Sequence, residues 1–106
     1  LLYHVFANLI DNAIKFNRDG GKITVRLEKQ ETNIVFSVSD EGPGIDDNAK
    51  NHIFDKFYQV NNSHSGEGNG LGLALVKRIL DIHKGSIEVN NNEDGIGCTF
   101  TVTLPR

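Results

Sequence analysis

The sequence has few of the features that mark several common protein classes. It contains one cysteine, two prolines, and no methionine or tryptophan in 106 residues. A single cysteine rules out a disulfide within the chain and fits a reducing compartment. No apolar run approaches the roughly 20 residues of a membrane-spanning helix. The formal net charge of -3 argues against a surface that binds nucleic acid by neutralising phosphates. We therefore expect no contact with nucleic acid and none with a membrane directly.

The spacing of apolar residues predicts an α/β protein with a single core. Helical spacing predicts helices over 1–17 and 71–83, and a short helix within 47–57. Alternating apolar residues predict strands over 22–28, 33–40, 86–89 and 98–104. This order predicts a two-layer α/β sandwich with a mixed, mainly antiparallel sheet covered on one face by helices. Residues 1–106 form one domain, and a chain that starts inside a helical pattern suggests a fragment of something longer.

A ridge of polar residues follows the first predicted helix at the margin of its apolar face. It consists of His4, Asn8, Asn12 and Lys15, each separated from the next by three or four residues. A half-buried amide needs hydrogen-bond partners, and hydrated Mg²⁺ bound to phosphates would supply them. A neutral amide oxygen does not repel a triphosphate, and Lys15 can reach a phosphate as a point charge. The alternative is that these amides cap loops or bridge to neighbouring strands.

A carboxylate on the core face of a strand is the second unusual feature. Alternation places Asp40 on the same face as Phe36 and Val38, where it is costly unless hydrogen-bond donors meet it. The amino group of adenine could be such a donor. Gly42 and Gly44, which follow, would let the backbone approach a flat ring. The alternative is an ordinary turn-forming aspartate before Gly-Pro-Gly.

Two glycine-rich stretches complete the set. Residues 66–73 run directly into the predicted helix, where free backbone N–H groups form an anion site, although a glycine-rich hinge is the alternative. Gly95 to Phe100 lead into the last strand, where either Cys98 or Thr99 must face the core. We interpret Cys98 as a small core residue, and a Thr99 hydroxyl on the core side would need a partner.

The order and spacing of these stretches resemble the catalytic ATP-binding domain of bacterial sensor histidine kinases. Residues 8–16 are similar to the family's N box, 40–45 to its G1 box, 53–58 to its F box and 68–73 to its G2 box, with 97–100 closing the set. The resemblance covers essentially the whole chain. It implies the Bergerat sandwich shared by gyrase, MutL-type and chaperone ATPases, with residues 46–68 as a mobile ATP lid.

The resemblance also implies roles for individual residues. Asn12 would ligate Mg²⁺, Asn8 would support the phosphate–metal site, and Lys15 would contact phosphate. Asp40 would hold the adenine amino group, with help from Thr99 through water. The remaining nucleotide contacts implied are Phe16, Gly42, Gly44 and Ile45 around the ring, Lys56 at the γ-phosphate, and Gly68, Gly70, Leu71, Gly72 and Leu73 at the phosphates.

The function implied is transfer of the γ-phosphate of Mg-ATP to an acceptor histidine on a separate dimerisation domain. Gyrase-like and chaperone ATPases have a glutamate base where this chain has Asn8, and an amide cannot take a proton. Phosphoryl transfer then depends on positioning and charge. No histidine here has the acceptor's sequence context, so the chain alone should not phosphorylate itself. A response regulator would act downstream of this cytoplasmic part of a membrane-anchored parent.

Three alternatives remain at this point. The first is a serine kinase of the anti-sigma-factor type, which shares the fold and the boxes. The second is an ATPase, which Asn8 disfavours, and the third is a regulatory domain that no longer binds nucleotide. The resemblance also implies that an edge strand before the first helix is missing.

Overall fold

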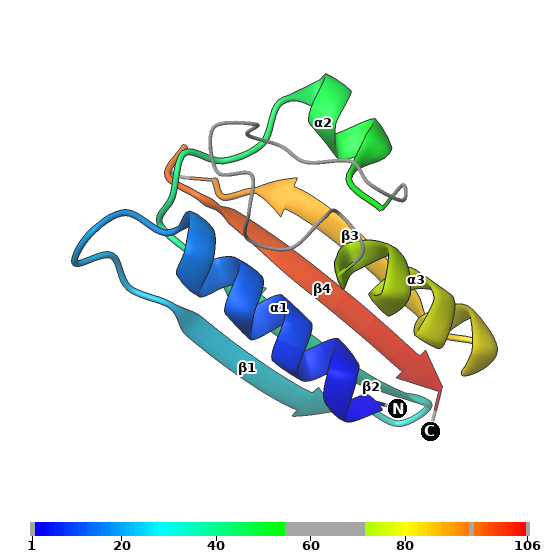
Figure 1. The fold of residues 1–106 in the computed structure, drawn as a ribbon. Helices are drawn as coiled ribbons and strands as arrows, with labels where there is room; N and C mark the ends of the chain where they lie inside the picture. The colour runs from blue at the N-terminus through cyan, green and yellow to red at the C-terminus, as the bar shows by residue number, and fades with distance from the viewer. Residues whose placement is uncertain (1, 55–71, 94, 106) are drawn as a thin grey trace.

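Two helices cover one face of a four-stranded sheet (Figure 1). The computed structural model describes residues 2–54, 72–93 and 95–105. The elements in chain order are α1 (Leu2–Phe16), β1 (Thr24–Lys29), β2 (Asn33–Ser39), α2 (Asp47–His52), α3 (Gly72–Ile82), β3 (Ser86–Asn91) and β4 (Cys98–Pro105). Figure 1 shows α1 and α3 in front of the sheet, running roughly along its strands, and α2 beside the edge strand β3. The predicted two-layer α/β sandwich is confirmed.

The strand order brings distant segments to one end of the sheet. The order is β1-β2-β4-β3, and each neighbouring pair is antiparallel. Ser39 at the end of β2 lies opposite Thr99, which in turn lies opposite Asn90 in β3. All the described strand pairs are therefore antiparallel. The expected mixed sheet would also contain a parallel pair, and the described strands form none.

The core lies between the helices and the sheet and follows the predicted periodicities. Buried side chains recur every three or four residues along α1 and α3, and at every second position along β2 and β4. The largest fully buried side chains are Val5, Leu9, Val38, Val76, Leu80 and Val102. No helix in the described ranges is long and apolar enough to cross a membrane.

The apolar side chains of strand β1 are more exposed than their alternating pattern suggests. Val25 and Leu27 lie opposite Val38 and Phe36 of β2, on the helix-covered face, yet 47% and 70% of their surfaces are exposed. The reason is that β1 is the edge strand, and α1 packs against β2. The alternating pattern therefore shows which side chains of β1 point toward the helix-covered face. It does not show how far β1 lies from the helices.

Two element boundaries differ from the sequence prediction in ways that affect packing. Helix α3 ends through Lys84, whose φ is 60°, while the Gly85 N–H donates to Leu80 O at 2.7 Å, as in a Schellman motif. The positive φ thus falls on Lys84 and not on Gly85. Glycine is required at position 85 because a Cβ there would lie 2.7 Å from the Leu104 side chain. Strand β3 continues to Asn91, two residues beyond the prediction.

Candidate functional site

A buried carboxylate lies where β2 ends. Asp40 is 5% exposed and is the one buried charged side chain among the described residues. Its Oδ1 accepts hydrogen bonds from the Gly42 N–H at 2.9 Å and the Cys98 N–H at 3.4 Å. Its Oδ2 accepts only a weak bond from the Cys98 thiol, with an Sγ–O distance of 3.7 Å, among the described residues. Because a carboxylate offers about four acceptor positions, Oδ2 retains capacity for a stronger donor.

Two glycines bring the neighbouring backbone against Asp40. A Cβ on Gly97 would collide with the main-chain carbonyl of Asp40, and Gly97 has a φ of 75°. A Cβ on Gly42 would collide with the carbonyl oxygen of Phe16. The last turn of α1, the end of β2 and the start of β4 therefore meet at one point, and any side chain at these two positions would push them apart.

The partner of Asp40 is Cys98, whereas Thr99 was expected to assist it. The Thr99 hydroxyl lies 3.0 Å from Ser39 Oγ and donates to the Asn92 side-chain carbonyl. Neighbouring residues of a strand face opposite ways, so Thr99 lies on the opposite face of the sheet from Cys98. The structure therefore does not bring Thr99 to Asp40. The interpretation of Cys98 as a small core residue is confirmed, since it is 8% exposed, but its contact with Asp40 was not predicted.

The polar ridge runs along α1 from His4 to Lys15, and its C-terminal part lies at the end of the fold that carries Asp40. Asn8 and Asn12 are half-buried, and Lys15 is exposed in the last turn of the helix. Neither amide is bonded to a described loop or strand, as the alternative interpretation of the ridge would require. The atom nearest to a Cβ built on Gly72 is Asn8 Oδ1, at 3.7 Å, so the first residue of α3 lies beside the ridge.

Side-chain bonds fix the C-terminal end of α1 to the strand end that carries Asp40. The Glu41 N–H donates to Asn17 Oδ1 at 2.9 Å. Glu41 Oε1 accepts from the Lys22 N–H at 2.8 Å and from the Arg18 guanidinium at 3.1 Å. The ion pair with Arg18 is exposed and contributes little on its own. The Asn17 bond joins the amide ridge and the carboxylate, and sequence reasoning missed it.

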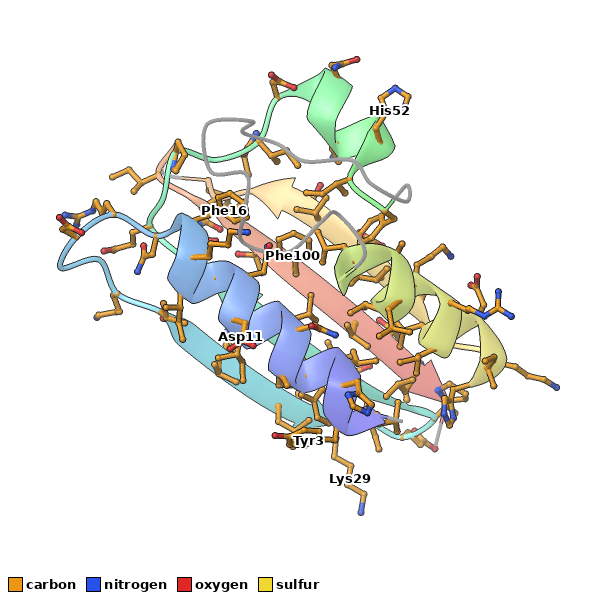
Figure 2. All side chains as sticks on the ribbon, viewed as in Figure 1. Tyr3, Asp11, Phe16, Lys29, His52 and Phe100 are labelled. Atoms are coloured by element: carbon orange, nitrogen blue, oxygen red, sulfur yellow. The ribbon has the colours of Figure 1, made fainter. Side chains whose placement is uncertain are left out.

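Several apolar residues lie at the end of the fold that carries Asp40. Ile45 is 7% exposed and belongs to the core, and Phe16 is half-buried. Phe54, after α2, packs edge-on against Phe100 with ring centroids 6.4 Å apart. Figure 2 shows Phe16 on the last turn of α1 and Phe100 on β4. The expected ring-lining residues are therefore at the same end of the fold as the carboxylate.

Part of the expected site lies outside the described residues. Lys56, Gly68, Gly70 and Leu71 fall there, as do residues 55–68 of the expected lid. Gly72 begins α3, and Leu73 is half-buried against the core. A polar cavity of about 360 Å³ adjoins Asp40 and is lined by Lys22, Thr24, Ser39, Glu41, Asn92, Glu93 and Ile96. Its walls do not include the α1 ridge, so it is not the space between Asp40 and the amides.

The Cys98 thiol should be protonated and should link stability to alkaline pH. Burial, the Asp40 charge and the hydrogen bond to Asp40 raise its pKa from 9.0 to about 12. A raised pKa means that the folded state holds the proton more tightly. The contribution is fully present below pH 9 and is lost as the pH rises toward 12. We expect the free energy of unfolding to fall more steeply above pH 9 in the wild type than in Cys98→Ser, whose hydroxyl does not titrate there. Parallel curves in urea unfolding would contradict this linkage.

Comparisons with known proteins agree with this arrangement. The family model described as "Histidine kinase-, DNA gyrase B-, and HSP90-like ATPase" matches residues 1–106. The heme sensor protein HssS of Staphylococcus haemolyticus is 44% identical over 106 residues, which are all of this chain and 23% of that protein. This chain therefore spans less than a quarter of that curated relative.

Solved structures give the same result. The mycobacterial sensor histidine kinase MprB superposes with a TM-score of 0.85 at 30% identity, over 96% of this chain and 70% of MprB. The histidine kinase ThkA in complex with the response regulator protein TrrA superposes with a TM-score of 0.79 at 31% identity, over 98% of this chain and 28% of ThkA. The family match over the full length shows that the chain belongs to the histidine kinase-, DNA gyrase B- and HSP90-like ATPases, as an ATPase domain of the sensor histidine kinase type.

Proposed function

We propose that this domain binds Mg-ATP and donates the γ-phosphate to an acceptor histidine on a separate dimerisation domain of its sensor kinase. The observation that carries the proposal is the buried Asp40 carboxylate. Its Oδ1 is held by two backbone N–H groups, while Oδ2 meets only a thiol among the described residues. The amides of Asn8 and Asn12 lie along α1, whose last turn meets the strand end that carries Asp40, and neither is bonded to another side chain or loop among the described residues.

Adenine recognition by Asp40 follows from the chemistry of this carboxylate. The 6-amino group of adenine is a neutral N–H donor of the kind that a buried carboxylate oxygen accepts. Phe16 and Ile45 supply apolar surface beside it. Gly42 and Gly44 let the loop lie close to a planar ring, and Gly44 has a φ of 82°. In this proposal Cys98 takes the supporting place that the sequence had suggested for Thr99.

The α1 ridge would hold the phosphate–metal end of the nucleotide. Asn12 would provide a neutral oxygen to Mg²⁺, which prefers oxygen ligands and keeps most of its waters, and Asn8 would support it from the previous turn. The metal would neutralise charge that develops on the phosphates. Lys15 would contact a phosphate from the last turn. Gly72 and Leu73 begin the helix whose N-terminal N–H groups favour an anion beside Asn8.

Transfer to a separate acceptor is favoured over hydrolysis by the identity of residue 8. An amide cannot accept a proton from water, so Asn8 orients groups and does not act as a base. The remaining work of the domain is to position the γ-phosphate and balance its charge. The acceptor histidine then supplies the nucleophile from its own domain. The ThkA structure is a complex with the response regulator protein TrrA. We propose that in this system, too, a response regulator is the partner, and that its receiver domain takes the phosphoryl group from the acceptor histidine.

The adenine assignment predicts a large effect of Asp40→Asn. The amide would place N–H donors against the adenine amino group or against Gly42 and Cys98, and each buried mismatch costs roughly 1–3 kcal/mol. We expect the affinity for Mg-ATP to fall by about 10- to 100-fold in titration calorimetry, and GTP, which lacks the 6-amino donor, to bind poorly to both proteins. The matched control is Asp81→Asn, which removes the same charge from an exposed ion pair on α3 and should bind ATP normally. Equal ATP affinity for the wild type and Asp40→Asn would refute the assignment.

The metal assignment predicts that Asn12→Asp impairs transfer more than nucleotide binding. The new carboxylate adds charge beside the phosphates and alters the metal geometry that the transfer requires. Autophosphorylation, with the dimerisation domain restored, should slow by at least about tenfold, while the ATP affinity changes less. Asn33→Asp is the control, because Asn33 lies at the opposite end of β2. Unchanged transfer in Asn12→Asp would place the metal elsewhere.

A further inference from the structure

The side chain of Asn91 binds both main-chain groups of Ile45. The Ile45 N–H donates to Asn91 Oδ1 at 2.8 Å, and Asn91 Nδ2 donates to Ile45 O at 2.8 Å. The two residues are separated by 46 positions in the sequence. The side-chain amide thus makes the two hydrogen bonds to Ile45 that the backbone of a neighbouring strand would otherwise make. An amide offers one donor and one acceptor in this arrangement, whereas an ionised carboxylate of the same length offers acceptors alone.

The sheet register explains why Asn91 reaches this loop. Asn91 lies directly opposite Cys98, so both side chains are on the helix-covered face. Cys98 in turn contacts Asp40, which makes a row of three polar side chains across the strand ends: Asn91, Cys98, Asp40. A Cβ on Gly44 would lie 2.7 Å from Asn91 Oδ1, so glycine at this position leaves the approach open.

The loop between Asp40 and Ile45 is consequently held at both ends by side chains. Gly42 is bonded to Asp40 Oδ1 at the first end, and Ile45 is bonded to Asn91 at the second. Without Asn91, the backbone of Ile45 loses both of its bonds to the side chain, and this end of the loop is then held by the packing of the buried Ile45 side chain. The loop residues are the ones that would line the adenine ring.

We propose that Asn91 is a positioning residue for adenine recognition, which fixes Ile45 and the Gly42–Ile45 loop without touching the nucleotide. The proposal rests on the adenine assignment made above. It predicts that the doubly bonded amide sets the affinity for the base. A purely structural role would instead lower the stability of the fold and leave the affinity unchanged.

The sharpest test is Asn91→Asp. The variant keeps an acceptor for the Ile45 N–H, but at neutral pH it loses the donor to Ile45 O and sets a carboxylate oxygen against that carbonyl. We expect the affinity for Mg-ATP at pH 8 to fall roughly tenfold, the size of one lost hydrogen bond in a partly buried position. Adenosine, which has no phosphates, should lose affinity by the same factor, because the defect lies at the base.

Lowering the pH should rescue this variant. A protonated carboxyl can donate to Ile45 O, so the facing carbonyl favours the neutral form and raises the pKa of the new group above its ordinary value near 4. Affinity relative to the wild type should therefore recover as the pH falls from 8 to about 5. Two charged side chains are placed near this strand end: Asp40, which contacts Cys98 opposite Asn91, and Lys50, which bonds Asn90. Both are present in the wild type and in the variant, so the comparison at each pH isolates the introduced carboxyl group.

Asn90→Asp is the matched control. It adds the same charge one residue away, and the side chain there only accepts a bond from Lys50 Nζ at 2.9 Å, which a carboxylate keeps. Its ATP affinity should match the wild type at each pH. Asn91→Ala, which removes both bonds without adding charge, should bind ATP weakly at every pH and show no recovery.

The outcomes separate the two proposals. A wild-type protein that does not bind ATP would refute the proposed function itself. The positioning role alone would be refuted if the wild type binds ATP and the Asn91→Asp and Asn91→Ala variants bind it equally well. In that case the variants would only melt at a lower temperature. Equal losses in Asn90→Asp and Asn91→Asp would assign the effect to added charge and would also overturn the inference.

Discussion

The arrangement of this protein depends on a carboxylate that is removed from water and still needs hydrogen bonds. A buried charge without donors is costly, so the chain around Asp40 is shaped to supply them. Gly42 turns its N–H back onto Oδ1, and Cys98 brings a second N–H and a protonated thiol. These donors satisfy Oδ1 more fully than Oδ2. The carboxylate is thereby fixed in place and keeps an acceptor position for a further donor.

The antiparallel sheet gathers the other parts of the site around this group. The end of β2, the start of β4 and the end of β3 coincide, and Asn17 ties the last turn of α1 to the same point. The buried Asp40 carboxylate and the amide ridge of α1, which we propose bind the base and the phosphates, are therefore held by one layer of strands and one helix. That placement is what a long nucleotide requires, because its base and its phosphates must be held at separate positions simultaneously.

Periodicity explains how much of this could be predicted from the sequence. Alternation along β2 identified Asp40 as a core-facing carboxylate, and helical spacing identified the ridge of Asn8 and Asn12, because both follow from local geometry. The alternating pattern likewise identified Cys98 as a core residue, but its contact with Asp40 depends on which strand ends meet in the sheet. The exposure of Leu27 could not be predicted this way, since it depends on how far α1 reaches across the sheet.

Bonds between a side chain and distant backbone were beyond sequence reasoning. Asn91 reads as one of three consecutive loop asparagines, and only the register of β3 against β4 places it beside Cys98 and within reach of Ile45. Asn17 similarly reads as the end of a helix, and its bond to Glu41 spans 24 positions. Such contacts depend on tertiary structure, and no local pattern of residues indicates them.

The central claim is that Asp40 recognises the 6-amino group of adenine. It is tested most directly on the unaltered protein by comparing Mg-ATP with purine riboside triphosphate, which has the same ring and phosphates but lacks that amino group. A hydrogen bond to a buried charged group contributes roughly 1.5–3 kcal/mol, so the analogue should bind about 10- to 150-fold more weakly. Equal affinity for the two nucleotides in titration calorimetry would contradict the account, because the buried carboxylate would then have no part in selecting the base.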